Sequence, residues 1–594
     1  MSSPPSSAKI WGIDELISLI LSNLDQRSLA WSARVCKDWA ELALDLLWRD
    51  VDDLPRLLNI LCPLSKSEKA TLQQGSTVYI YKFRRRITAG DWNNFLRYTK
   101  RIRRLVYCQK SGKLWRRLLD NSVFSELFKS CPTPVLLPNL HTLVWHAECD
   151  KKQTYSLPFT HARLKHLDVQ LHQPEQPLAS YLQQIARRSP EITHLTLHFL
   201  SSARIFEDEI TSFLPRLRRL QKLTLPLYGL TSRVVQELSL SPDLQEISLS
   251  IPTEFGNGDR TDVMAFSPVL RPGAFPIIQR LSFSSTLQDA TRFLQDPFFP
   301  TQIFSLYVHV LTIVEPSIIR EFFTTVKHRC PALTELHVDF MICPDSALTV
   351  PGPPLHERPD ISTFRPLFAC RRLTSFEFRW DYALNLTDDD MHEFATSWPA
   401  LEHLHLHCEP VIEFTLPALT LQALLPFARH CPNLRTLGLY MDTTVPPPTD
   451  SDSASSPITP FPALTQLFVG ASAITSIDTA ALFLSQLLAP HCSLITGVRW
   501  PDAYGVALDD AGIFDERRAR MCEFWVRWNE LAKVLPLVIR ARAAERARAA
   551  GMLSELEAWV VKGRAEALRC ERLQREVVAL QLRCGSVQAS VADR

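Results

Sequence analysis

The sequence lacks the short motifs on which many enzymes depend. It has no Gly-x-x-x-x-Gly-Lys phosphate loop, no Gly-x-Ser-x-Gly turn, no His-Glu-x-x-His and no dinucleotide-binding glycine pattern. Gly256-Asn-Gly258 lacks a third glycine and is interpreted as a turn. We therefore predict no catalytic residue and no cofactor.

The chain also lacks an excess of one charge, long apolar runs and closely paired cysteines. Its 65 basic and 63 acidic residues leave a net charge of +2, so no overall field would recruit nucleic acid. No window of about 18 residues is continuously apolar, which argues against a membrane span. The 14 cysteines include no Cys-x-x-Cys pair, which disfavours a zinc module or a disulfide framework. We expect a soluble protein of the cytoplasm or nucleus, without a nucleic-acid or membrane partner.

Residues 13–48 have the pattern of three short helices. Apolar residues at spacings of three and four predict the first helix: Ile13, Leu16, Ile17, Ile20, Leu21 and Leu24. Asn23 and Asp25 break this pattern, and Ser28 is a suitable N-cap for a second helix. Helices of about ten residues bury little surface among themselves, so this segment should lean on a partner or an adjoining domain.

This segment resembles an F-box. The resemblance rests on the runs LSNLD (21–25), RSL (27–29), RVCKDW (34–39) and LWR (47–49), whereas GID (12–14) stands where the family usually has a Leu-Pro or Ile-Pro pair. F-box helices typically dock on the Skp-type linker subunit of a cullin–RING ubiquitin ligase, so the resemblance implies that linker and, through it, a cullin as partners. The linker-binding residues it implies are Ile13, Leu16, Ile17, Ile20, Leu24, Leu29, Val35, Cys36 and Trp39. The alternative is an ordinary helical cap on the next domain.

A Leu-x-x-Leu-x-Leu frame then recurs along the chain. Clear copies run from Leu140/Leu143/Trp145 to Leu464/Leu467/Val469, with weaker ones at Ile102/Leu105/Tyr107 and Ile495/Val498/Trp500. The end of each frame alternates as a short strand does. Several frames follow a helical pattern that stops at a proline, as at Cys330-Pro331. This unit of helix, turn and strand predicts a solenoid with a concave parallel sheet and convex helices.

The segments HCPNLRTLGL (430–439) and RCPALTELHV (329–338) resemble leucine-rich repeats, of the cysteine-bearing kind often found behind an F-box. The frames start 24 to 40 residues apart, which indicates a degenerate version, and an α/β sheet domain with the same alternation is the alternative. We predict an α/β fold: a small all-α F-box, a leucine-rich-repeat-like solenoid and a helical tail. The expected organisation is a disordered N-terminus at 1–10, an F-box at 11–50, a connecting segment at 51–135, a repeat domain at 136–505 with a disordered loop at 443–462, and C-terminal helices at 511–585.

The tail is rich in Ala, Glu, Arg and Leu, as long helices are. Pro536 is expected to kink or divide it. A coiled-coil-like seam steps by threes and fours through Ala567, Cys570, Leu573, Val577, Leu580 and Cys584. Because a solenoid needs a covered end, we favour capping of the last repeats by this tail over pairing with another chain.

The concave face is the expected recognition surface. In each frame, the residue between the last two apolar positions and the residue after the frame should point away from the core. Such positions give Tyr307, His309, His337, Asp339, Glu377, Arg379, His405, His407 and Tyr440 as substrate-binding candidates. His403, His405 and His407 are the best metal pattern, but exposed recognition residues are the plainer interpretation, so no metal ligand is predicted.

Together these observations favour a non-catalytic substrate adaptor, in which the F-box holds the linker and the repeats hold an unidentified protein substrate. Two other classes stay open: a repeat scaffold without a ligase, and a hydrolase or transferase whose site is built from residues far apart in the sequence.

Overall fold

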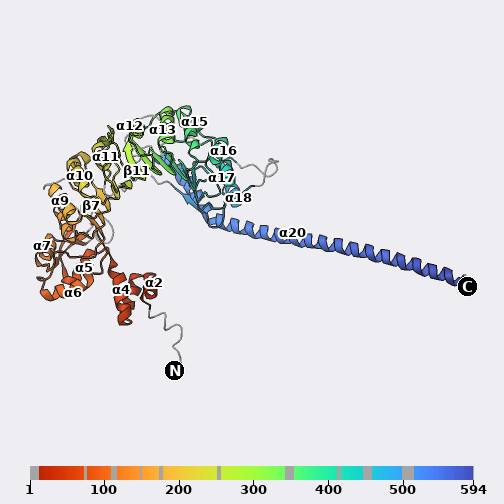
Figure 1. The fold of residues 1–594 in the computed structure, drawn as a ribbon, viewed down its shortest axis with the longest axis horizontal. Coiled ribbons are helices and arrows are strands. Elements are labelled where there is room, and N and C mark those ends of the chain that lie inside the picture. Colours follow the sequence, from red (N-terminus) through yellow and green to blue (C-terminus); the bar gives the residue numbers. More distant parts are fainter. Residues whose placement is uncertain are drawn as a thin grey trace, which may run out of the picture.

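A computed structural model describes residues 13–71, 77–108, 117–147, 150–172, 178–250, 256–340, 353–380, 382–407, 409–410, 417–445, 458–497 and 514–592. Figure 1 shows an arch of repeats, with short helices at its N-terminal end and a long helix leaving its C-terminal end. The N-terminus and residues 446–457, which fall in the two segments expected to be disordered, lie outside the described residues.

Three helices open the described chain: α2 (Asp14–Ser22), α3 (Gln26–Ser32) and α4 (Lys37–Arg49). Asp25, not Ser28, is the N-cap of α3, because its carboxylate accepts the Ser28 N–H at 2.9 Å and the helix begins earlier than expected. A small core holds the three helices together through Ile17, Leu21, Leu29 and Ala43.

The repeats form one sheet of 15 strands, and neighbouring strands pair in parallel. In order along the sheet they are β1 (Asp50–Val51), β4 (Arg104–Cys108), β6 (Thr142–His146), β7 (His166–Gln170), β8 (His194–His198), β9 (Lys222–Pro226), β10 (Glu246–Ser250), β11 (Arg280–Ser285), β12 (Ser305–Val310), β13 (Glu335–Asp339), β14 (Ser375–Arg379), β15 (His403–Leu406), β16 (Thr436–Leu439), β17 (Gln466–Gly470) and β18 (Ser493–Thr496). The second leucine of each frame is in register with its neighbours, as Leu143 is with Leu105 and Leu167. The predicted fold class, a helical segment followed by a leucine-rich-repeat-like solenoid, is confirmed.

Helices line the convex side of this sheet (Figure 1). They are α5 (Leu54–Leu61), α6 (Ala89–Thr99), α7 (Asn121–Ser130), α8 (Asp150–Gln153), α9 (Leu178–Arg188), α10 (Glu207–Phe213), α11 (Ser232–Leu238), α12 (Leu287–Gln295), α13 (Pro316–Arg329), α15 (Ile361–Phe364), α16 (Asp388–Ser397), α17 (Leu424–His430) and α18 (Ile477–Leu487). One continuous apolar core runs between sheet and helices and includes Cys330 and Cys431, which act as small buried groups under the turns. A small second sheet, β2 (Leu64–Thr71), β3 (Thr77–Phe83) and β5 (Arg117–Leu119), adjoins the first repeats.

The sheet reaches into residues 51–135, which the sequence interpretation treated as a connection. The weak frame at Ile102 forms β4, and β1 follows α4 directly. The Leu-x-x-Leu-x-Leu frame does not predict β1, because that strand is only two residues long. At the far end, Leu494 of β18 is in register with Leu467, so the expected frame at Ile495 is not the one used, and Val498 and Trp500 lie outside the described residues.

The tail is a single helix, α20 (Phe514–Ala592), which is not divided at Pro536. Its first part covers the last repeat through four buried residues, Trp528, Leu531, Leu535 and Ile539. Trp528 Nε1 also donates a hydrogen bond to the Ser472 carbonyl at 2.9 Å. The rest of α20 leaves the arch (Figure 1), and the seam residues Leu573 and Val577 are exposed. Contact with the last repeat is therefore confined to the start of the tail.

Candidate functional site

The outer face of α2 and α3 is apolar and exposed. The side chains of Ile13, Leu16, Leu19, Ile20, Leu24, Trp31 and Val35 are between 37% and 77% exposed. Of the residues expected to contact a linker, Ile17 and Leu29 are instead buried between the helices, Trp39 is half-buried and Cys36 is exposed. Exposed apolar side chains gathered in this way are typical of an interaction surface.

Two members of this face were not among the expected residues. Trp31 is 77% exposed and Leu19 is 64% exposed. Both fall outside the apolar positions from which the F-box residues were predicted, so that pattern could not select them. An exposed tryptophan is a strong signal in its own right, because this residue type dominates interface energies.

The three helices are firmly attached to the solenoid. The Arg101 guanidinium, just ahead of β4, forms ion pairs with Glu41 and Asp45 of α4. Trp48, near the end of α4, packs edge-on against Tyr98 with ring centroids 5.5 Å apart. Because α4 runs straight into a strand of the main sheet, the apolar face keeps a fixed orientation relative to the repeats.

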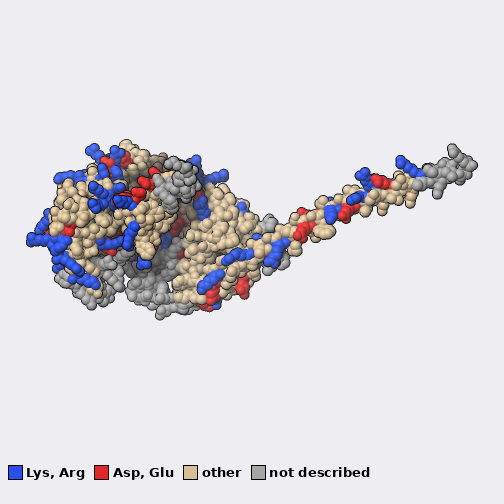
Figure 2. All heavy atoms as spheres, turned by 90° about the horizontal axis from the view of Figure 1, so that it is seen from below, with Lys and Arg blue, Asp and Glu red and all other residues tan. Residues whose placement is uncertain are grey.

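Basic side chains gather over the N-terminal repeats, the end of the molecule away from α20 (Figure 2). Two hollows of about 640 and 610 Å³ lie near this junction and share Arg49, Arg103 and His141. In the hollow of about 610 Å³, Glu41 and Asp45 neutralise part of the positive charge.

A polar network covers the concave face of β12, β13 and β14. The Tyr307 hydroxyl donates to Asp339 at 3.2 Å, and the Arg379 guanidinium donates to the same carboxylate at 3.3 Å. Two residues earlier along β13 and β14, on the same face, His337 Nδ1 lies 3.1 Å from Glu377 Oε2. The structure thus brings together five of the predicted recognition residues from three consecutive repeats.

The charges of this network are fixed by their neighbours. Burial alone would raise the pKa of Glu377, but the hydrogen bond with His337 and the charges of His405 and Arg379 outweigh it and lower the pKa to about 2. Burial opposes the charge of Arg379, yet Asp339 and Glu377 hold its pKa above the usual value. Burial and the charge of Asp339 also raise the pKa of Tyr307 well above its usual range. The network therefore presents the Glu377 anion and the Arg379 cation at neutral pH.

Next to this network the concave face is hollowed. A cavity of about 520 Å³ opens over β13 to β16 and is lined by Glu335, His337, Thr374, Ser375, Phe376, Glu377, Glu402, His403, His405 and Thr436. Its lining mixes imidazoles with carboxylates, which suits a polar peptide or loop better than an apolar ligand.

His403, His405 and His407 do not converge on one point. His403 Nδ1 lies 2.8 Å from the Thr436 hydroxyl. The His405 ring lies over Gly438, with its centroid 4.6 Å from that of Phe468 and the two ring planes tilted by 59°. His407 has a positive φ of 39° and accepts a hydrogen bond from the backbone N–H of the residue after Arg379 at 3.1 Å. Each of the three imidazoles therefore has contacts of its own.

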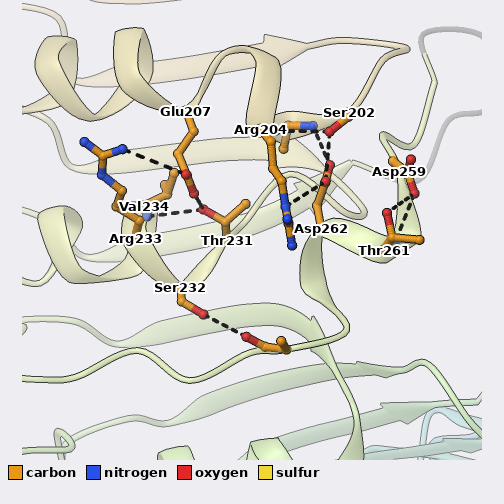
Figure 3. A network of polar contacts seen from close by, with 12 residues as sticks. Ser202, Arg204, Glu207, Thr231, Ser232, Arg233, Val234, Asp259, Thr261 and Asp262 are labelled. Carbon is orange, nitrogen blue, oxygen red and sulfur yellow. Dashed lines mark hydrogen bonds and ion pairs between the residues drawn. The ribbon is translucent and has the colours of Figure 1, made fainter.

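Four predicted concave residues are buried rather than exposed: His309, Asp339, His407 and Tyr440. His309 is covered by Tyr228, which follows β9 and has its ring centroid 5.7 Å from that of His309. The segment after β10 adds to this cover. In that segment η6 (Arg260–Val263) is anchored by Asp262, which accepts from the Ser202 hydroxyl at 2.8 Å (Figure 3). Arg260 in turn donates to the Leu311 carbonyl, so the segment covers the end of β12. Frame position could not reveal this cover, because the covering residues lie in the connections after β9 and β10 and not in the frames.

Burial leaves His309 in an unusual state. The Tyr228 hydroxyl lies 3.5 Å from its Nε2, and its Nδ1 has no hydrogen-bond partner among the described residues. Desolvation lowers the pKa of His309 to about 4, so the side chain is neutral at physiological pH.

Comparison with known proteins gives one family match and two solved structures. Residues 14–53 match the family model described as F-box-like. The crystal structure of the leucine-rich repeat-containing protein LegL7 from Legionella pneumophila is similar at 13% identity and a TM-score of 0.31, over 50% of this chain and 89% of that one. A protein from Bacteroides fragilis matches at 12% identity and a TM-score of 0.24, over 48% of this chain and 69% of that one. No curated protein matches the chain.

The chain thus combines an F-box-like helical segment with a leucine-rich-repeat-like solenoid, and the assignment of the solenoid rests on its own strand register. No helix in the described parts of the chain has both the length and the hydrophobicity of a bilayer span.

Proposed function

We propose that this protein is a substrate-recognition adaptor of a cullin–RING ubiquitin ligase. The carrying observation is the exposed apolar face of α2 and α3, which belongs to the segment that matches the F-box-like family. F-box segments generally bind a Skp-type linker, and an apolar face with no cover within the described chain is the surface such a linker would need. The proposed role is non-catalytic and places the protein in the cytoplasm or nucleus.

The substrate-binding part of the proposal is the concave face from β12 to β16. It offers a preformed hollow, the Glu377 anion and the Arg379 cation, which together favour a folded or extended polar segment of complementary charge. Tyr307 and Arg379 are of the residue types that most often carry interface energy. A repeat scaffold that binds partners without a ligase is the second candidate, since the same concave face would serve it equally well.

Capture of the purified Skp-type linker separates the two candidates. The double variant Leu16→Ala/Ile20→Ala removes apolar area from the exposed face while leaving the helix core intact. It should lose linker binding, whereas Leu240→Ala, at a leucine that is 53% exposed elsewhere on the solenoid, should retain it. Full linker binding by the double variant, or none by the wild type, would favour the scaffold.

Substrate placement needs a separate measurement. A chain carrying the Leu16→Ala/Ile20→Ala double variant should retain substrates in cells, so that they can be captured and identified. Glu377→Ala/Arg379→Ala in the same background should release a captured partner with linker binding in the parent chain unchanged. If the partner instead depends on residues 546–592, the concave-face assignment is wrong.

A further inference from the structure

Three side chains of metal-ligand type converge on the concave face of the N-terminal repeats. His146 ends β6, Asp168 lies in the middle of β7 and His198 ends β8. His146 Nε2 is 2.7 Å from Asp168 Oδ1, and His198 Nε2 is 3.1 Å from the same oxygen. We propose that these three residues form a binding site for a divalent cation of the zinc class, independent of the linker and substrate surfaces.

The three donor atoms are already close to the arrangement that a bound cation requires. All three donor atoms lie within 4.8 Å of one another, and both imidazoles turn Nε2 toward a single carboxylate oxygen. The two rings, although two strands apart, lean over β7 until their centroids are 5.0 Å apart. Tetrahedral ligands at about 2.0 Å from zinc stand about 3.3 Å apart, so a small outward movement of the rings admits the ion.

The site is built into the sheet rather than assembled from mobile surface groups. His146 and His198 are each only 6% exposed, and parallel pairing fixes the register of the strands that carry them. Two histidines and one carboxylate are a ligand set that zinc accepts, with a fourth position left for water or another donor.

The surroundings of the site favour the same class of ion. Gln170, paired with His198 across β7 and β8, is 1% exposed, and neither atom of its amide has a partner among the described residues. A water bound to the cation would give the Gln170 amide a hydrogen-bond partner, since residues around a metal site commonly hydrogen bond to its ligands. Cys108, paired with His146 across β4 and β6, hydrogen bonds to that imidazole. Imidazole and thiol donors select zinc-like ions over magnesium or calcium.

Sequence spacing could not have found this site. Its ligands come from three different repeats, at the position after the frame in two of them and inside the frame in the third. The short spacings that mark zinc motifs, His141-x4-His146 and His194-x3-His198, pair each histidine with one that is not part of the cluster.

Cobalt uptake tests the proposal on the full-length protein, purified without a histidine tag and treated with chelator. Titration with Co²⁺ alone should saturate at one equivalent with the visible absorption of four-coordinate cobalt, and Zn²⁺ should displace it. His146→Gln/His198→Gln should abolish the signal. His166→Gln/His194→Gln is the matched control, because these histidines lie on β7 and β8 with rings 4.2 Å apart but share no carboxylate, and it should leave uptake unchanged.

Three results would overturn the proposal: no stoichiometric uptake by the wild type, undiminished uptake by His146→Gln/His198→Gln, or equal loss in the control. The first does not depend on whether any variant folds. It would mean that the cluster is a hydrogen-bonded structural triad. None of these outcomes bears on linker or substrate binding, so the proposed function would stand or fall separately.

Discussion

Replacing Trp528 by alanine should open the C-terminal end of the solenoid. The side chain is 1% exposed, packs with Leu531 and Leu535 on the last repeat, and donates its indole N–H to the Ser472 carbonyl. A buried tryptophan removes about 200 Å² from water, which at about 25 cal/mol per Å² amounts to about 5 kcal/mol. Measured Trp→Ala changes of about 3–5 kcal/mol agree with this figure. The free energy lost with this one contact is therefore large compared with the free energy that stabilises a terminal repeat.

Hydrogen exchange is the appropriate assay, because a repeat protein can open at one end without unfolding throughout. Protection should fall in β17, β18 and α18 and persist in β12 and β13. Trp559→Ala is the matched control: this tryptophan lies in the same helix, is 72% exposed, and should change stability by less than about 0.5 kcal/mol. Deleting 511–594 should cause aggregation, whereas deleting 546–594 should not. Indistinguishable exchange in the two tryptophan variants would refute capping by the start of α20.

Three further changes test other parts of the molecule. Ile17 is 1% exposed, so Ile17→Ala should lower the free energy of unfolding by about 2–5 kcal/mol. Ile20 is 43% exposed, so Ile20→Ala should weaken linker capture and leave the melting temperature unchanged. Equal destabilisation by the two variants would contradict this division. The pKa of His309 is about 4 when folded and 6.5 in the reference state, so its neutral form stabilises the fold above pH 6.5 and this contribution is lost as pH falls toward 4. Urea unfolding should therefore lose about 2 kcal/mol between pH 7 and 5, and His309→Gln should remove that slope; an unchanged slope would exclude His309 as its source. Gly438→Ala would place a Cβ 2.4 Å from His405 Nδ1 and displace that ring, so partner capture should fall while the circular dichroism stays native; unchanged capture would place the partner away from this hollow.

Much of the fold could be predicted from the sequence, because local periodicity and the strand register agree. Each clear frame from Leu140 to Val469 became a strand whose leucines align across the sheet. The strand β1 escaped prediction because two residues are too few to carry a period. Capping by the tail was expected, but the sequence could not select Trp528 for it, because its contacts form only after the last repeat is in place.

The candidate sites were predicted less completely. Alternation along a strand correctly placed Tyr307, His337 and Glu377 on one face, where they share hydrogen bonds or a hollow. It could not report what lies above that face, where Tyr228 and the segment that carries Arg260 cover the end of β12 and His309. Similarly, the stripe on α2 marked apolar residues without separating the buried Ile17 from exposed neighbours, since both lie within the same apolar arc.

The direct passage from α4 into β1 has a mechanical consequence. No flexible linker separates the apolar face from the sheet, and each later strand is paired with the one before it. Neighbouring strands lie about 4.8 Å apart, so inserting or deleting one repeat between β8 and β12 would move the hollow relative to α2 by about that distance, with a small rotation. The residues of both surfaces would stay the same, and only the distance between the surfaces would change. If the protein serves a ligase, the number of repeats would then set the distance between linker and substrate. That distance would determine which substrate lysines come within reach of the ubiquitin donor.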